Sequence, residues 1–424
     1  MSGILNGLGI CAPTIDGTAT IGIPWNHNAI QRWTERQPSL LRFEAFYPHD
    51  PVSSTSLLDL TKGFSFGIDL DDPWRYSGMN PPRSIIIPHL LSISLPEGKI
   101  LDEADDREIR ARGEVESGTV AGRAVVSLSD YLGQSKVDFV RCWFPWKYFE
   151  PLPIAEANLD HLLEESYSHW PLDDLVSTLT SHGIGIVPVI GCGYHRMLPQ
   201  GLEPDNNKTL YLKRVSTHAR LLVRKYKDQV KCWQIENEPN WWTAHEAGGW
   251  RSGSSWIRDP IFKQQLLRRL NTAVHTEDSS AKTIINLEAD AKTLDPGAYS
   301  SSCDIFGLDF YPNYRSSHPI NTKVLKLADD VAKALGKPVM ISETGYPSGP
   351  SFLGYSAERQ AEYVASACRD AHQLDGVTGI GIWRYIDTAW RSFPPQENHF
   401  GLFDNKGSQK PGWAAFSKVI GELK

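Results

Sequence analysis

The chain has 424 residues and a formal net charge of −7. Its hydrophobic content of 41% and charged content of 22% are typical of a soluble globular protein with one large domain or a few small ones. The acidic balance argues against a binding surface for nucleic acid or for an anionic membrane. The oligomeric state is left open.

The N-terminus does not look like a targeting segment. Residues 1–13 have no basic n-region, and their apolar run is too short for a signal peptide. No stretch approaches the ~20 apolar residues of a membrane span. We therefore expect a cytoplasmic protein, or a secreted one whose signal peptide has been removed. The six cysteines show neither a zinc-type CxxC spacing nor a disulfide framework.

The organisation of the chain changes near residue 63. Residues 1–62 are rich in Gly, Pro, Thr and Ser and are predicted to form an N-terminal β-rich extension. From 63 to 424, apolar runs alternate with helical patterns, which predicts one catalytic domain. Residues 71 to about 125 are long for a connection, so we expect an inserted lobe or lid there.

Eight apolar runs are predicted as strands, at 64–70, 137–144, 185–190, 230–239, 283–287, 304–311, 338–343 and 379–385. Helical patterns occur at 127–133, 172–182, 210–227, 260–277, 323–335, 357–372 and 412–423. Apolar strands that alternate with helices indicate a parallel sheet buried on both faces. Eight such units most economically close into an α/β fold, the (β/α)8 TIM barrel. An open doubly wound sheet is the alternative, but no Gly-rich phosphate turn follows the first strand.

Polar side chains gather where the predicted strands end. The fourth strand runs into Glu236, Asn237 and Glu238, and the seventh ends at Glu343. The other strand ends carry Asp69, Arg141, His195, Asp309, Tyr311 and Trp383. Because chemistry in such barrels gathers at the carboxyl ends of the strands, these residues are the candidate site.

The fourth and seventh strands of an eight-stranded barrel lie across its mouth from each other. Two carboxyl groups about 5 Å apart can perform retaining glycoside hydrolysis, one as nucleophile and the other as acid and then base. That chemistry requires no metal and no organic cofactor. The expected partner is a carbohydrate, either a β-glycan or an oligosaccharide. Tryptophans in predicted loops could line outer sugar subsites with their flat rings; they are Trp241, Trp242, Trp250, Trp256 and Trp390.

The two Glu-bearing segments also resemble a known family. Residues 235–239, Ile-Glu-Asn-Glu-Pro, resemble the fourth-strand Asn-Glu-Pro motif of the clan A glycoside hydrolases, and residues 341–347 are similar to their seventh-strand nucleophile segment. The resemblance covers most of 63–424, with all eight strands in order. It implies a retaining β-glycosidase in which Glu238 is the acid/base, Glu343 is the nucleophile and Asn237 binds the sugar 2-hydroxyl.

The resemblance carries over to further positions. It implies that Arg141 orients Glu343, that Tyr311 donates to Glu343, and that His195 and Trp383 border the subsite where the bond is cut. Cellulase-like members place His two residues before the sixth-strand Tyr, where this chain has Asp309, so the substrate is not inferred from that branch. Residues 306–312 and 343–347 also resemble the galactanase and β-1,3-glucanase branches.

Other interpretations of the same residues stay open. Glu236 is expected in a structural ion pair, Asp69 could contact substrate or form a salt bridge, and Arg141 could be a buried counter-ion. A transglycosylase with the same residues and a non-catalytic carbohydrate-binding barrel are alternatives. A metal-dependent barrel hydrolase would be expected to have paired His at a strand end, and the sequence shows none. The sugar, its linkage, and endo or exo action are not indicated.

Overall fold

The structure, a computed structural model, describes most of the expected barrel. The described residues are 58–71, 136–144, 146–149, 172–192, 198–199, 202, 207–240, 259–289, 294–387, 395–404 and 408–424. Most of the expected N-terminal extension, nearly all of the expected insert and the helix expected at 127–133 lie outside them.

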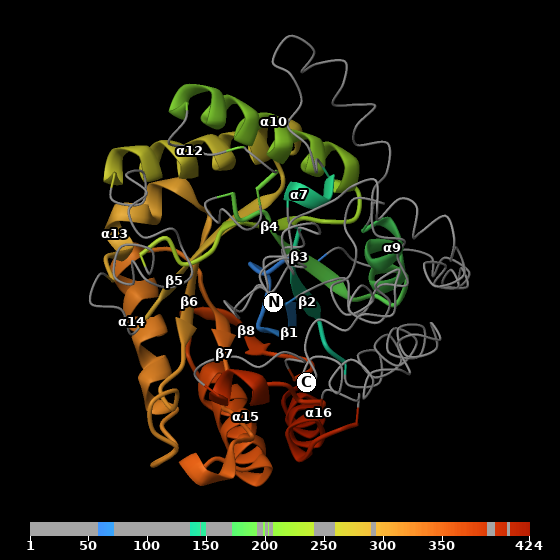
Figure 1. The fold of residues 1–424 in the computed structure, drawn as a ribbon, viewed down its shortest axis with the longest axis vertical. Helices are drawn as coiled ribbons and strands as arrows, with labels where there is room; N and C mark the ends of the chain where they lie inside the picture. The colour runs from blue at the N-terminus through green and yellow to red at the C-terminus, as the bar shows by residue number, and fades with distance from the viewer. Residues whose placement is uncertain are drawn as a thin grey trace, which may run out of the picture.

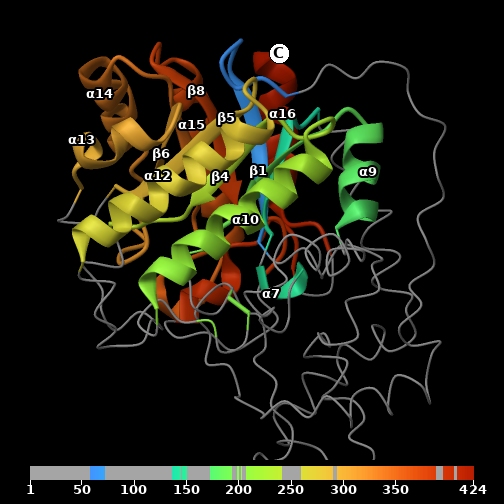
Figure 2. The ribbon, with the colours of Figure 1, turned by 90° about the horizontal axis from the view of Figure 1, so that it is seen from above.

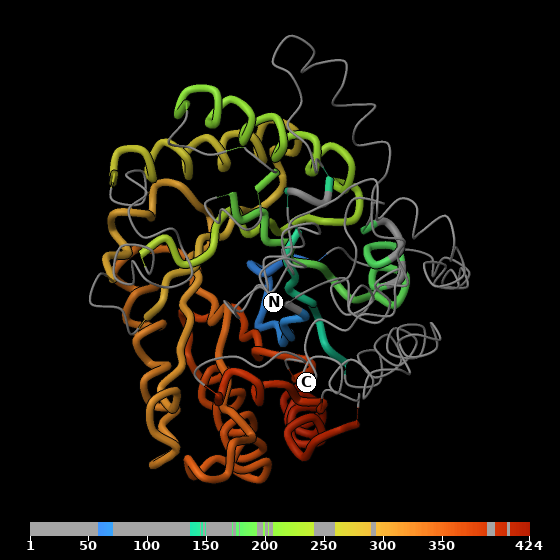
Figure 3. The backbone as a smooth tube through the Cα atoms, in the orientation of Figure 1, coloured from blue at the N-terminus to red at the C-terminus, as the bar shows by residue number. Residues whose placement is uncertain are grey.

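Eight parallel strands close into one barrel (Figure 1). They are β1 (Ser65–Asp71), β2 (Phe139–Trp143), β3 (Gly185–Val189), β4 (Cys232–Glu236), β5 (Lys282–Glu288), β6 (Ile305–Phe310), β7 (Val339–Thr344) and β8 (Val377–Trp383). Each strand pairs with the next, and β8 pairs with β1, so the blue first strand and the red last strand lie side by side in Figure 3. The predicted (β/α)8 barrel is confirmed.

Helices surround the strands (Figures 1 and 2). They are α7 (Trp146–Phe149), α9 (Asp173–Ser181), α10 (Lys208–Tyr226), α12 (Pro260–Glu277), α13 (Pro296–Tyr299), α14 (Lys326–Leu335), α15 (Ala357–His372) and α16 (Pro411–Leu423). Short 3-10 turns are η6 (Ser300–Ser302), η7 (Lys323–Leu325), η8 (Ser351–Leu353) and η9 (Pro395–His399). Within this shell, α12 packs against β4, α14 against β7 and α15 against β8.

Local sequence explains where the helices begin. The side chains of Asn207, Asp259 and Ser356 each accept a hydrogen bond from a backbone N–H in the first turn of α10, α12 and α15. Such capping satisfies donors that have no partner inside the helix. The helix α14 ends at Gly336, which adopts the left-handed conformation that glycine takes without steric cost.

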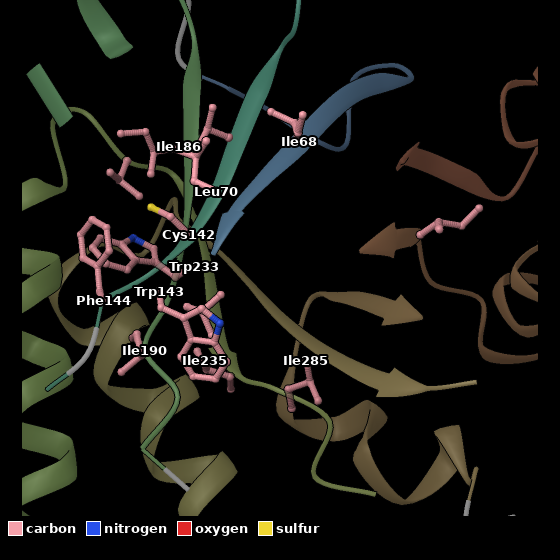
Figure 4. Packing of buried hydrophobic residues seen from close by; sticks show 14 of the residues in the cluster. Ile68, Leu70, Cys142, Trp143, Phe144, Ile186, Ile190, Trp233, Ile235 and Ile285 are labelled. Atoms are coloured by element: carbon pink, nitrogen blue, oxygen red, sulfur yellow. The ribbon is translucent and has the colours of Figure 1, made fainter. Parts of the chain in front are cut away.

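The outward side chains of the strands form the main hydrophobic core against the helices. Figure 4 shows part of this cluster, where Trp143, Ile190, Trp233 and Ile235 gather around β2 to β4. Full burial of one such large apolar side chain contributes about 1.5–3 kcal/mol. This layer therefore holds the helices on the barrel and leaves the inward positions available for other purposes.

A smaller apolar cluster fills the lower interior of the barrel. It takes one inward residue from each of β2 to β7 together with Leu60, which precedes β1; the strand members are Phe139, Val187, Cys232, Ile284, Ile305 and Met340. Leu60 falls within the range expected for the N-terminal extension. A Cβ at Gly67 would lie 2.1 Å from the Phe139 ring, so a glycine on β1 is what lets that ring fill the floor.

The cysteines that the structure describes are buried thiols without disulfide bonds. Cys142, Cys192, Cys232, Cys303 and Cys368 are all buried and unbridged in the described part of the chain. Burial raises the pKa of Cys232 and of Cys303 to about 12, so these thiols stay protonated and unreactive. No helix within the described ranges has both the length and the apolar character needed to cross a membrane.

Gly67→Ala should test the packing of the floor. Because the added methyl would overlap the Phe139 ring, we expect the free energy of unfolding to fall by about 1–3 kcal/mol. Gly421→Ala in α16 is the matched control, since nothing lies within 4 Å of its added Cβ and helix propensity favours alanine by up to about 1 kcal/mol. Urea unfolding midpoints measure both. Equal behaviour of the two variants would contradict this account of the floor.

Candidate active site

A layer of polar side chains lies above the apolar floor, toward the carboxyl ends of the strands. Side chains of a strand alternate between its two faces, so the residue two positions after an inward apolar residue also points inward. Arg141 follows Phe139 in this way, and Gln234 follows Cys232. The layer is fully or nearly fully buried and consists of Asp69, Arg141, Gln234, Asn286, Asp309 and Ser342.

The Arg141 guanidinium is the centre of this layer. Its Nε donates to Gln234 Oε1 at 2.6 Å, and Nη2 donates to Asn237 Oδ1 at 2.6 Å. Its Nη1 forms ion pairs with the Asp69 carboxylate and, at 2.8 Å, with Glu343 Oε1. Although burial works against the charge, Glu343 and Asp69 raise the pKa of Arg141 above its ordinary value. Arg141 is therefore a permanent buried cation.

Both oxygens of Glu343 are held by donors. Oε1 contacts Arg141, and Oε2 accepts from the Tyr311 hydroxyl at 2.6 Å. Burial first, and then the Glu343 charge, raise the pKa of Tyr311, so this phenol remains a donor. These two contacts hold the Glu343 carboxyl group in one fixed orientation.

A register shift explains why two consecutive residues of β7 point inward. Leu308 pairs with Ile341 and Asp309 pairs with Glu343, which leaves Ser342 as an extra residue between them. A bulge of this kind bends the strand and re-aims the side chain that follows. As a result, Ser342 donates to Asp309 while Glu343 reaches Arg141.

Glu238 lies two residues beyond the end of β4, and its backbone is unusual. Its φ of 42° is in the left-handed region, which non-glycine residues rarely occupy and which is found at functional sites. Its N–H donates to Asn286 O and Oδ1, both at 3.1 Å. The Asn240 amide clamps the backbone of Glu288, with Nδ2 donating to O at 2.9 Å and Oδ1 accepting from N at 3.0 Å. These contacts fix the turn that carries Glu238.

The half-buried Glu238 carboxyl is electrostatically linked to Glu343. Burial first, then Glu343 and then Glu288 raise the pKa of Glu238 well above its ordinary value, while a hydrogen bond with Asp309 and the charge of Arg141 oppose this shift. Like charges raise each other's pKa in this way only at short range. The site therefore combines a carboxyl that tends to keep its proton with a carboxylate held by cationic and hydroxyl donors.

Aromatic rings line the site on the side of β8. The half-buried Trp383 contacts Tyr311 edge-on, with ring centroids 5.7 Å apart, and Phe400 at 4.9 Å. The Arg384 guanidinium lies 4.9 Å from the centroid of the Trp383 ring. A ring held in this manner offers a flat apolar surface next to the carboxyl groups, which suits a sugar face.

The structure brings together eight of the nine residues that the sequence indicated. Asp69 forms the ion pair that was one of its two expected roles, and Glu236 is buried with Oε1 accepting from Asn237 N at 3.0 Å. The eight lie within a strand or just beyond its carboxyl end and are Asp69, Arg141, Asn237, Glu238, Asp309, Tyr311, Glu343 and Trp383. His195 and the five loop tryptophans lie outside the described residues.

Sequence reasoning missed several members of the site. Gln234, Asn286 and Ser342 each sit on the inward side of an otherwise apolar strand, and this alternation was a usable signal. Glu288, which raises the pKa of Glu238, is the last residue of β5 and could have been found in the same way. Asn240 carries no local signal, because its partner Glu288 is distant in sequence.

Within the ranges that the structure describes, no group of three or more His, Cys, Asp or Glu side chains is arranged to hold a metal ion. The carboxylates of the site instead contact Arg141, Tyr311, Asn286 and Ser342.

Comparison with known proteins rests on structure, since neither a protein-family model nor a curated protein matches the sequence. The chain is similar to a GH5_18 protein of Streptomyces cattleya in complex with Manβ1-4GlcNAc, with a TM-score of 0.55 and 16% identity over 71% of this chain and 76% of that one. A GH5_18 protein of Bifidobacterium longum subsp. longum, in complex with the same disaccharide, gives 0.54 and 15% over 70% and 73%.

An exo-β-1,4-mannosidase of Opitutaceae bacterium strain TAV5 gives a TM-score of 0.53 and 16% identity over 88% of this chain and 62% of that one. At these identities the likeness establishes a common fold. The chain thus shares its barrel with glycoside hydrolases.

Arg141→Met should show how much the polar layer depends on its cation. Removal of one partner leaves Asp69 and Glu343 buried without a counter-ion, so we expect the free energy of unfolding at neutral pH to fall by about 3–5 kcal/mol.

Arg369→Met is the matched control. It breaks the exposed pair of Arg369 with Glu422 and should cost less than about 1 kcal/mol. Urea denaturation at neutral pH measures both variants. A loss for Arg141→Met no larger than that of the control would be incompatible with a central role for this cation.

Proposed function

We propose that the protein is a retaining β-glycosidase that works by double displacement, with Glu343 as nucleophile and Glu238 as acid/base. One observation carries the proposal. A carboxylate held by Arg141 and Tyr311 shares the barrel mouth with the carboxyl group of the half-buried Glu238, whose pKa it raises. A pair of carboxyl groups whose environments differ in this way is the arrangement that glycoside hydrolysis uses.

In the first step Glu343 attacks the anomeric carbon of the sugar. A bond forms between that carbon and a Glu343 oxygen while the bond to the leaving oxygen breaks, and the proton of Glu238 moves to the leaving oxygen. Arg141 and Tyr311 hold both Glu343 oxygens, so the nucleophile does not have to reorganise at the moment of attack.

In the second step Glu238 changes role. Once Glu343 is esterified it carries no charge, and the repulsion that helped to raise the pKa of Glu238 disappears. The pKa of Glu238 then falls, and its carboxylate can take a proton from water as the water attacks the anomeric carbon. Glu343 leaves as a carboxylate and returns to its contacts with Arg141 and Tyr311.

Asn237 and Trp383 are proposed to position the sugar. Asn237 Oδ1 accepts from Arg141 at 2.6 Å, Asn286 at 2.8 Å and Gln234 at 3.1 Å. These donors fix which end of the amide carries the nitrogen, and we propose that this Nδ2 donates to the 2-hydroxyl. The disaccharide Manβ1-4GlcNAc in two similar structures and the mannosidase name of a third make β-mannosides the first substrates to test.

Azide rescue should identify the two roles by product stereochemistry. With an activated aryl β-glycoside, Glu343→Ala should lose turnover by at least about a thousandfold and recover with azide as the α-glycosyl azide, because azide replaces the nucleophile in a single inversion. Glu238→Ala should yield the β-glycosyl azide, because the covalent intermediate still forms. Proton NMR of the products distinguishes the two.

Glu362→Gln, an exposed position on α15, is the control and should keep wild-type turnover. Opposite stereochemistry in the two variants would reverse the assignment of roles. Sugar binding without turnover across β-mannosides, β-glucosides, β-galactosides and β-xylosides would instead support a non-catalytic barrel.

The dependence of kcat/KM on pH should reveal the pKa of the proposed acid, Glu238. Because Glu238 must hold a proton and its pKa is raised, kcat/KM of the wild type should fall on the alkaline side only above the ordinary range of glutamate. Activity is present below that pKa and is lost as the pH rises through it. Glu238→Gln, assayed with a leaving group that needs no protonation, should lose this limb. Persistence of the limb would assign it to another group.

A further inference from the structure

Phe400 supports the aromatic rings of the site from within the protein. It is 1% exposed, and its ring contacts Trp383, Tyr311 and Tyr314, with centroids 4.9, 5.6 and 6.3 Å apart. A Cβ at Gly345 would lie 2.9 Å from the Phe400 ring, so a glycine just after β7 leaves the space for it. Protein interiors packed this closely transmit a displacement from one side chain to the next. The position of Phe400 therefore affects the position of Trp383.

The backbone also links Phe400 to Trp383. Arg384, the residue after Trp383, donates from its N–H to Phe400 O at 3.4 Å and accepts from Leu402 N at 2.9 Å. The Arg384 guanidinium in turn lies 4.9 Å from the centroid of the Trp383 ring. A shift of the chain at Phe400 would thus reach Trp383 through the backbone as well as through the rings.

Gln360 on α15 holds the chain at Phe400, which itself lies outside any helix or strand. The Gln360 side chain is fully buried, and its Nε2 donates to the carbonyl oxygens of His399, Phe400 and Gly401 at 3.3, 3.1 and 3.1 Å. It also donates to Tyr346 O at 2.9 Å, in the segment that follows β7. Four carbonyl oxygens that converge in a buried place need a donor, because an unsatisfied buried acceptor costs free energy.

Lys410, directly before α16, holds the next residue of the same chain. Its Nζ donates to Gly401 O at 2.9 Å, Ser348 Oγ at 2.8 Å and Asp387 Oδ1 at 2.6 Å, which matches the three donors of an ammonium group. Asp387 Oδ1 also accepts from Gly401 N at 2.8 Å. Side chains therefore fix both backbone groups of Gly401, the residue after Phe400.

We propose that Gln360 and Lys410 are positioning residues for sugar binding. They fix the backbone that carries Phe400, and Phe400 fixes the Trp383 ring against which the sugar lies. The placement of Trp383 follows from the contacts alone, while its consequence for the sugar rests on the function proposed above.

The pair of Lys410 and Asp387 contributes geometry more than stability. Burial raises the pKa of Asp387 to about 6 against the opposing effect of Lys410, and burial lowers the pKa of Lys410 against the opposing effect of Asp387. Both shifts reflect the hydration that the pair has lost. Because that loss offsets much of the attraction, a buried ion pair adds little net stability. It does impose one arrangement on Gly401.

Gln360→Met tests the first of the two residues. Methionine has a similar volume but no donor, so the four carbonyl oxygens lose their common partner. With the glycoside that the wild type hydrolyses best, we expect KM to rise about tenfold. We expect kcat to change less than about threefold, because a flat ring binds the sugar in the ground state and in the transition state alike. Steady-state kinetics measure both constants.

The double variant Lys410→Met with Asp387→Asn tests the second residue. It removes the ammonium group without leaving a buried carboxylate unpaired, and the new amide oxygen can still accept from Gly401 N. KM should again rise with little change in kcat. If Gln360→Met does not fold, this variant carries the test.

Thr283→Val is the matched control. Thr283 is fully buried at the start of β5, at the opposite end of the barrel from the site, and its Oγ1 donates to Asn271 Oδ1 at 2.6 Å. Valine keeps the shape of the side chain and removes this buried bond. The control should therefore unfold at lower urea concentration than the wild type and keep the wild-type KM.

Fluorine NMR tests the placement of Trp383 without any substrate. In protein labelled with 5-fluorotryptophan, the Trp383 resonance is identified by its absence from Trp383→Phe. This resonance should shift or broaden in Gln360→Met and in the double variant, and it should stay in place in Thr283→Val.

An unmoved Trp383 resonance in the folded variants, or a KM equal to that of the wild type, would make Gln360 and Lys410 merely structural and overturn the proposal. Failure of the wild type to hydrolyse any glycoside would instead overturn the proposed function, and the fluorine spectra would still decide whether these two residues place Trp383.

Discussion

The site depends on one buried guanidinium. Arg141 lies inside the barrel with almost no exposed surface, and it balances Asp69 and Glu343 while also binding Gln234 and Asn237. Carboxylates cannot stay charged in an interior without such a partner, because the loss of hydration is too costly. The cation therefore permits a polar layer in the middle of an otherwise apolar barrel, and it gives that layer one fixed arrangement.

Two irregularities of the backbone, in addition to the Arg141 cation, position the site residues. The extra residue Ser342 in β7 lets Ser342 and Glu343 both point inward, and Glu238 has a left-handed backbone just beyond the end of β4. The double hydrogen bond of Asn240 to Glu288 and the contacts of Asn286 hold that turn. Regular strands alone would deliver neither carboxyl group, so the chemistry depends on these local departures from regularity.

Much of the fold was readable from hydrophobic periodicity. The helices α12 and α15 have the predicted bounds, since Asp259 and Ser356 mark their starts as capping residues. Strand ends were less predictable. The fourth strand was expected from 230, but Val230 N still donates to Tyr226 O at the end of α10, so β4 begins at Cys232. The start of a strand can thus depend on a backbone hydrogen bond across a turn. The pattern of apolar residues does not encode such a bond.

By itself the sequence determined the eight alternating strands and helices, the closed barrel that they build, and the strand ends at which Glu238 and Glu343 occur. Hydrophobic periodicity and short motifs depend only on residues that are close together in the sequence. They can therefore be recognised without the tertiary structure. Only the tertiary structure decided that Asp309 bonds Ser342, Asn286 and Glu238. Those partners come from three different strands or strand ends, and the pKa values of the carboxyl groups depend on burial and on charges that meet only once the barrel has closed.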